Sequence, residues 1–165
     1  MLKRASIAAA TALAMATPAF AQTFSPAGSS FTMSGYLSAS DVETVNCATT
    51  LYGVVSADGT SATITGGSFA PGSGPTSGKC GVIFHPNDFP WTLQPGSAST
   101  VNLLGIGMGY FLGHCSGSIF GASWTNGPPG VGAATITPVM ISGAYGGCLV
   151  HGALATSPSL TITPP

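Results

Sequence analysis

Three histidines, His85, His114 and His151, are the residues of this sequence best suited to chemistry. An imidazole acts as a general base or a metal ligand near neutral pH. His114 precedes Cys115 by one residue, and His151 follows Cys148 by three. If these two cysteines join neighbouring strands, both imidazoles lie on one face of the sheet. A metal site usually takes three or four ligands and His85 lies in a separate proline-containing segment, so we expect surface histidines and no metal site.

Other catalytic arrangements are scarce. The sequence contains no G-x-S-x-G motif, so nothing indicates a serine nucleophile on a sharp turn. Asp41 and Glu43 are close in sequence, in a polar stretch typical of a solvated turn. The Gly105–Gly109 run, G-x-G-x-G, continues as a strand and is not a dinucleotide-binding fingerprint, which requires a following helix. We therefore predict no catalytic residues, no cofactor and no enzymatic activity.

The N-terminus has the three parts of a secretory signal peptide. Lys3 and Arg4 supply the positive charge, and an apolar run covers residues 5–16. Ala19-Phe20-Ala21 fits the small residues before a cleavage site. A membrane-spanning helix needs about 20 apolar residues, and this run is shorter. We predict a signal peptide over residues 1–21 and a mature chain that has no membrane span. It is secreted or held at the cell surface, with the periplasm as another destination.

The mature chain is nearly free of charge. Beyond residue 21, Lys79 is the only Lys or Arg, against Asp41, Glu43, Asp58 and Asp88. Charged residues make up 4% of the whole sequence, compared with about 25% of an ordinary soluble domain. A single lysine cannot form the basic patch that nucleic acid requires. Because an uncharged surface does not repel its own copies, we expect the partner to be an apolar surface or hydrocarbon, or copies of the protein itself.

Four cysteines predict two disulfides, because an exported chain meets an oxidising environment. The spacing from Cys47 to Cys80 equals the spacing from Cys115 to Cys148. This regularity favours the pairs Cys47–Cys80 and Cys115–Cys148. The cross-pairing of Cys47 with Cys115 and of Cys80 with Cys148 stays open, since spacing alone does not determine connectivity.

The residues around the two cysteine pairs also match, which indicates an internal repeat. Ala62-Thr63-Ile64-Thr65 in the first half corresponds to Ala134-Thr135-Ile136-Thr137 in the second, and each half then reaches a Gly-x-Cys-x-Val sequence. We predict one all-β domain over residues 22–165, built from a duplicated β unit with repeats near residues 31–98 and 99–165.

The mature chain reads as short strands separated by Gly- and Pro-rich turns. Many such strands are typical of a sandwich or a barrel, and we expect a β-sandwich-like domain held by the two disulfides. In the strand over residues 104–112, alternate glycines make one face flat, so that another sheet or a ligand can come close. The expected strands cover residues 30–38, 49–55, 60–65, 80–84, 91–94, 100–112, 116–122, 133–141 and 160–163.

The most aromatic stretch of the mature chain contains Phe84, Phe89 and Trp91, with two prolines among them. These rings are either anchors buried beneath a loop or an exposed contact for a sugar, a lipid or another subunit. We treat them as candidate interface contacts.

Several short segments recur together over most of the mature chain and carry a family resemblance. They are Ala19–Ala21, Phe24–Thr32, Val45–Cys47, Cys80–Ile83, Phe89–Thr92 and Cys115–Ile119. Their order resembles that of the PraB-like family of bacterial alkane-oxidation activator proteins. The resemblance implies a small exported protein of Gram-negative bacteria that helps cells use poorly soluble hydrocarbons, and it carries no catalytic residues over to this chain.

Two functional hypotheses follow. The leading one is an exported, non-enzymatic accessory protein that acts at a hydrophobic interface or at the cell surface. Oxidising an alkane requires a metal or flavin to activate oxygen, and the sequence offers no site for either. The alternative is a self-assembling structural subunit of an extracellular fibre or surface coat, because strands with open edges can pair between copies.

Overall fold

The strands form because apolar residues recur at every second position. In β3 (Thr44–Val55), Val45, Cys47, Thr49 and Leu51 are buried, and the residues that alternate with them are more exposed. β2 (Ser30–Ser40) has the same pattern, with Met33 and Leu37 buried. A period of two is that of a strand with one face on the core and one on solvent.

The computed structural model describes residues 22–40, 43–110, 113–127, 132–143 and 147–164. The predicted signal peptide, Asp41, Phe111 and Leu112 lie outside these residues. The remaining elements are β1 (Thr23–Ser25), β4 (Ala62–Pro71), the 3-10 turn η1 (Ser77–Lys79), β5 (His85–Asn87), β6 (Trp91–Ser97), β7 (Thr100–Tyr110), β8 (Gly113–Thr125), β9 (Gly132–Gly143), β10 (Cys148–Ser157) and β11 (Thr161–Thr163).

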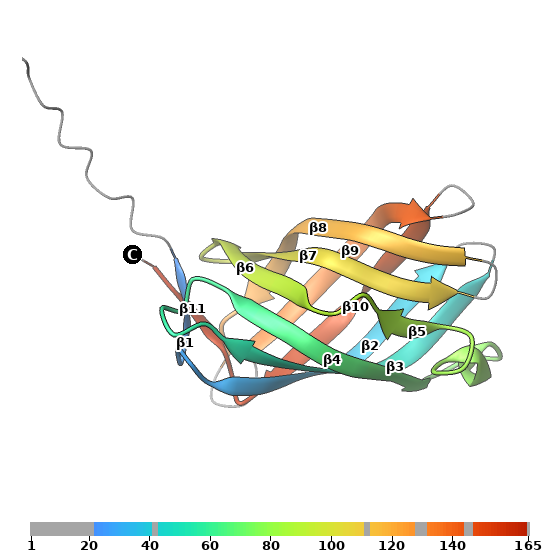
Figure 1. Ribbon diagram of the computed structural model, residues 1–165, viewed down its shortest axis with the longest axis horizontal. Helices are drawn as coiled ribbons and strands as arrows, with labels where there is room; N and C mark the ends of the chain where they lie inside the picture. The colour runs from blue at the N-terminus through green and yellow to red at the C-terminus, as the bar shows by residue number, and fades with distance from the viewer. Residues whose placement is uncertain (1–21, 41–42, 111–112, 128–131, 144–146, 165) are drawn as a thin grey trace, which may run out of the picture.

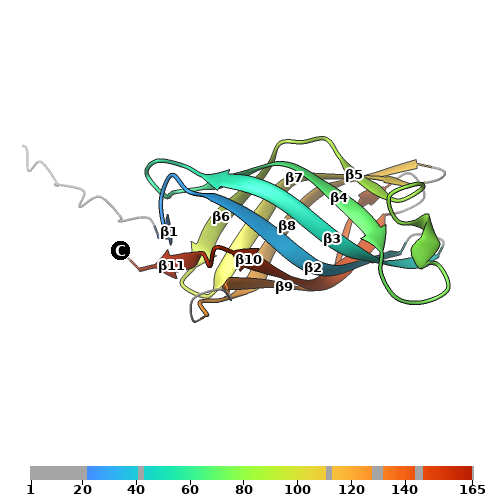
Figure 2. The same ribbon diagram turned by 90° about the horizontal axis from the view of Figure 1, so that it is seen from below.

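The main sheet closes on itself. Its strands follow the order β7-β6-β4-β3-β2-β10-β9-β8, and β8 pairs again with β7 (Figures 1 and 2). β5 pairs with β7 on the same side as β6, so the two short strands occupy one position in the wall, broken at residues 88–90. The prediction of an all-β domain with two disulfides is confirmed. Its strands form an eight-stranded barrel instead of two stacked sheets, so each described strand of the ring pairs on both sides along at least part of its length.

Two runs of four consecutive strands make the barrel: β2, β3, β4 and β6, then β7 to β10. The first half of the chain holds the Cys47–Cys80 bridge, and the second holds Cys115–Cys148. The disulfide pairing that the spacing favoured is thus confirmed. A duplicated unit would produce this arrangement, and the duplication itself stays a prediction.

Both ends of the described chain meet at one end of the barrel. β1 pairs with β11, with Phe24 opposite Ile162, and both side chains are buried. Asn126 joins them to the barrel, because its side chain donates to the Ile162 carbonyl (2.8 Å) and accepts from the Ile162 N–H (2.7 Å). The Phe24 ring also meets Trp124 edge to face at 5.7 Å. The strand predicted near residues 160–163 therefore pairs within its own chain.

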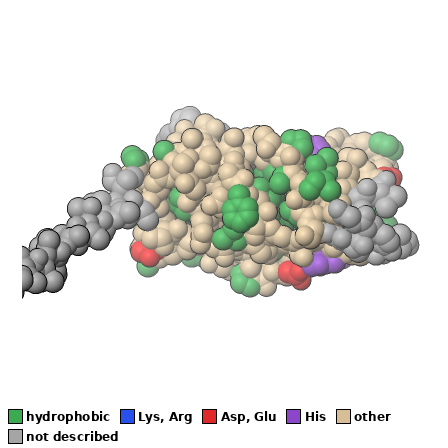
Figure 3. Space-filling view, turned by 90° about the horizontal axis from the view of Figure 1, so that it is seen from above, with side chains coloured by type: hydrophobic (Ala, Val, Ile, Leu, Met, Phe, Trp, Pro, Cys, Tyr) green, Lys and Arg blue, Asp and Glu red, His purple; other side chains and the backbone are tan. Residues whose placement is uncertain are grey.

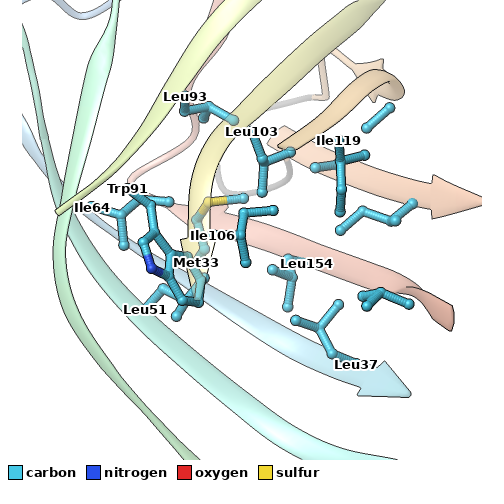
Figure 4. Close-up of a cluster of buried hydrophobic side chains, with 14 of the residues drawn as sticks. Met33, Leu37, Leu51, Ile64, Trp91, Leu93, Leu103, Ile106, Ile119 and Leu154 are labelled. Carbon is cyan, nitrogen blue, oxygen red and sulfur yellow. The ribbon is translucent and has the colours of Figure 1, made fainter. Parts of the chain in front are cut away.

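Large apolar side chains fill the interior of the barrel. Figure 4 shows them converging from strands all around the wall. Close packing of this kind leaves the outer wall as the surface available to partners. The labelled side chains are Met33, Leu37, Leu51, Ile64, Trp91, Leu93, Leu103, Ile106, Ile119 and Leu154.

One strand prediction was wrong, and three strands, β1, β5 and β10, were not predicted. Residues 80–84 form a turn, because Gly81 has a φ of 78°, a conformation that a strand does not contain. β10 was missed because Gly152, Ala153 and Ala155 lie in its middle, and Gly and Ala have low β propensity. Small residues are needed there: a Cβ on Gly152 would collide with the carbonyl oxygen of Tyr36 on β2.

Candidate functional site

The described strands of the barrel lack the side chains that are always charged at neutral pH. None of these strands contains Asp, Glu, Lys or Arg. Glu43, Asp58, Lys79 and Asp88, the charged residues of the described ranges, all lie outside the strands, and Lys79 forms an ion pair with Glu43. The outward positions of the strands are occupied mainly by Ser, Thr, Ala and Gly.

The carboxylate of Asp58 holds a turn in place by accepting hydrogen bonds. Its carboxylate accepts hydrogen bonds from the Ser56 hydroxyl (2.6 Å), the Thr60 hydroxyl (2.9 Å) and the Thr60 N–H (3.0 Å). These bonds, that from Ser56 foremost, lower the pKa of the Asp58 carboxyl from 3.8 to about 2. The carboxylate thus stabilises the connection between β3 and β4.

Large apolar side chains are spread over the uncharged wall. Tyr36, Tyr52 and Val54 project from β2 and β3, while Phe120 and Met140 project from β8 and β9. Phe120 is 72% exposed. Figure 3 shows the pattern on one face, with separate hydrophobic patches among uncharged polar side chains and backbone. We call the outward faces of the strands, with these five side chains, the neutral wall.

The structure places the three predicted aromatic contacts mostly inside the protein. Phe84 is 0% exposed and Trp91 is 1% exposed, so neither can contact a partner, and that part of the prediction is corrected. Phe89 is partly exposed and stacks on Trp91 at 4.7 Å. Burial is possible for Trp91 because its indole N–H donates to the Asn87 carbonyl at 2.8 Å.

Phe84 closes a seam in the wall, which is a stretch where β4 has no paired strand on one side. β4 pairs with β6 only over Ala62–Ile64, and beyond this its pairing is with β3 alone. Phe84 stacks on Phe69 of β4 at 4.9 Å and meets Tyr110 of β7 edge to face at 6.0 Å. The Cys47–Cys80 bridge holds in place the segment that carries Phe84.

Two of the histidines lie over the flat face of β7. A Cβ on Gly109 would lie 2.6 Å from the His85 ring, and a Cβ on Gly107 would lie 2.5 Å from Asp88. Asp88 in turn contacts His114, with 2.6 Å between Oδ2 and Nε2. The alternate glycines thus admit covering side chains from the β5 segment. The described residues contain no cluster of three or more His, Cys, Asp or Glu side chains arranged for a metal ion.

His151 lies apart from His114. The Cys115–Cys148 bridge joins β8 to β10, and β9 lies between these strands, so the condition for a shared histidine face is not met. His151 instead lines a shallow groove of about 540 Å³ on the neutral wall, together with Tyr36 of β2 and Asn46 of β3. The groove was not predicted from the sequence. The sequence feature that could have indicated it is Pro138, a proline within a strand, close to Gly152 on the neighbouring strand.

A comparison with protein families shows which known proteins this chain is related to, which the fold alone does not show. The chain matches the family described as Alkane oxidation protein activator PraA/PraB-like over residues 1–164. It belongs to this family. The match agrees with the resemblance drawn from the sequence, and the family description is consistent with an accessory role in alkane oxidation. No curated protein and no solved structure gave a significant match. None of the described segments of this PraA/PraB-like protein is a helix with the length and apolar character to span a membrane.

Proposed function

We propose that this PraA/PraB-like protein is an exported, non-enzymatic accessory protein that acts at the surface of a hydrocarbon or at another hydrophobic interface. The observation that carries the proposal is the neutral wall, because no described strand bears a charged side chain. The family description, which links these proteins to alkane oxidation, supports the choice of hydrocarbon.

The physical basis is the low cost of bringing this wall to an apolar phase. Moving an ionised side chain out of water costs several kcal/mol or more, whereas hydroxyl and methyl groups cost far less. Tyrosine suits such a boundary, since its ring is apolar and its hydroxyl keeps contact with water. Tyr36 and Tyr52, more than half exposed on neighbouring strands, supply two such rings.

The polar groups of the protein support an accessory role. Asp58 holds a turn, Glu43 pairs with Lys79, and Asp88 contacts His114. Each of these groups already has a structural partner. The chemical step of alkane oxidation would then belong to another protein, and this chain would act on the access of cells to the hydrocarbon.

Interfacial tension at a hexadecane–water boundary tests the proposal. The oxidised protein comprising residues 22–165 is expected to lower the tension, and Tyr52→Lys, which puts a charge on the neutral wall, is expected to weaken the effect. Val82→Lys is the matched control, because Val82 is exposed in a turn outside the strands. A wild-type protein that leaves the tension unchanged would contradict the proposal.

Light scattering without hydrocarbon addresses the alternative of a fibre or coat subunit. That alternative depended on open strand edges, and the described strands of the ring leave only short ones, such as the part of β4 beyond Ile64, which Phe84 packs against. We therefore expect small particles of one size. Large regular particles would favour the assembly subunit instead.

A further inference from the structure

The groove beside His151 crosses four neighbouring strands of the outer wall. Asn46 comes from β3, Tyr36 from β2, His151 and Ala153 from β10, and Pro138 from β9. Ala153 lies at the centre of its floor, since it is paired with Tyr36 on one side and with a β9 residue on the other. The volume of about 540 Å³ falls within the range of about 300–1,000 Å³ for small-molecule sites.

An irregularity in the ladder creates the groove. The register between β9 and β10 shifts between Val150 and Gly152, so that His151 faces an extra residue of β9. Pro138 lies in this stretch, and it has no N–H to donate to a neighbouring strand. On the other side of β10, Gly152 lets the β2 backbone come very close. β10 therefore lies close to β2 at Gly152, whereas its pairing with β9 is interrupted beside His151.

The groove combines a mostly apolar lining with the imidazole of His151. Nδ1 of His151 and Oδ1 of Asn46 are buried out of reach of a ligand and have no hydrogen-bond partner among the described residues. A buried N–H without an acceptor is rarer in proteins than a buried acceptor without a donor, so we infer that the imidazole proton lies on Nε2. Nε2 has no hydrogen-bond partner among the described residues, and this N–H is thus free to donate to a ligand. Such an arrangement fixes the orientation of a mostly apolar molecule.

Charge narrows the class of ligand. Among the described residues no Lys or Arg lines the groove, and Lys79 is already paired with Glu43. A carboxylate in the groove would therefore lose water without gaining a cation. A pure alkane would cover the Nε2–H of His151 without offering it an acceptor. An unbranched alcohol has both an apolar chain for the lining and an uncharged hydroxyl for this N–H.

We propose that this groove binds medium-chain primary alcohols, with the hydroxyl accepting a hydrogen bond from Nε2 of His151 and the chain lying across Ala153. The proposal rests on the proposed function only for the choice of hydrocarbon-derived ligands. A primary alcohol differs from its alkane by one inserted oxygen atom, so the ligand class is the first product of terminal alkane hydroxylation. Binding itself involves no covalent change.

Titration of the isotope-labelled oxidised protein (residues 22–165) with 1-octanol tests the site by NMR. We expect saturable shifts confined to the amides around Tyr36, His151 and Ala153. Octanoate at pH 7 is expected to bind at least tenfold more weakly. His151→Phe removes the donor, and the loss of one hydrogen bond is expected to weaken 1-octanol binding roughly fivefold.

A matched pair of variants separates the groove from the rest of the wall. Ala153→Phe fills the floor and is expected to abolish the shifts. Ala155→Phe adds the same ring two residues along β10, outside the groove, and is expected to leave binding unchanged. Equal binding by both variants, or shifts spread over the wall without saturation, would overturn the site.

The experiments distinguish a failure of the interface proposal from a failure of the alcohol site. The Ala153→Phe variant is expected to lower hexadecane–water tension as the wild-type protein does, because the neutral wall remains. A protein that binds 1-octanol in the groove yet leaves the tension unchanged would refute the interface proposal alone, and the reverse result would refute the alcohol site alone.

Discussion

Replacing Phe84 by alanine tests whether one ring closes the seam between β4 and β5. Phe84 is fully buried and contacts the rings of Phe69 and Tyr110. Truncating a buried Phe to Ala costs about 3–5 kcal/mol, and aromatic pairs contribute roughly 0.5–1.5 kcal/mol each beyond burial. Because two pairs are lost here, we expect the free energy of unfolding to fall by about 4–5 kcal/mol.

Urea unfolding of the oxidised protein, followed by tryptophan fluorescence, measures this loss. Val82→Ala is the control, because Val82 lies two residues away in the same segment and is 78% exposed; its effect is expected within about 0.5 kcal/mol. A double-mutant cycle between Phe69→Leu and Phe84→Leu is expected to give a coupling of about 1 kcal/mol. If Phe84→Ala costs less than about 1 kcal/mol, far below the usual core penalty, the ring does not close the seam.

Three further predictions concern a turn, a glycine in a strand and a disulfide. Asp58→Asn is expected to lower the Tm at pH 7; because the folded pKa of Asp58 is depressed from 3.8 to about 2, its stabilising effect is complete above pH 4. The Tm difference should therefore shrink as the pH falls from about 4 to about 2. Gly107→Ala should displace Asp88 and destabilise the protein, whereas Gly66→Ala, with no atom within 4 Å of its new Cβ, should not; thermal unfolding compares them. Removing the Cys47–Cys80 bridge by double alanine substitution is expected to cost roughly 3–4 kcal/mol, measured by urea unfolding.

The local character of the fold was predictable because it rests on local signals. Alternating burial in β3 follows directly from its sequence, and the Asp58-Gly59 turn lies where a hairpin signal places it. Equal cysteine spacing favoured the pairing that the structure has. Closure of the ring was not predictable, because it depends on pairings between distant strands, such as β2 with β10.

The candidate site was harder to predict for the same reason. The composition indicated an uncharged surface, and the structure places the charged residues of the described ranges outside the strands. Phe84 and Trp91 could not be assigned from sequence, since burial of an aromatic ring depends on what packs over it. The groove at His151 depends on a register shift between β9 and β10, which no short sequence window encodes.

The pairing of β2 with β10 also determines when the protein can fold. β2 is among the first strands to be synthesised and β10 among the last, so one side of β2 has no neighbour until nearly the whole chain has been made. β1 remains unpaired even longer during synthesis, because its partner β11 ends at Thr163. Contacts so distant in sequence form slowly. We expect the nascent chain to remain unfolded throughout translation, which is the state that a chain must keep if it is to pass through a narrow export channel.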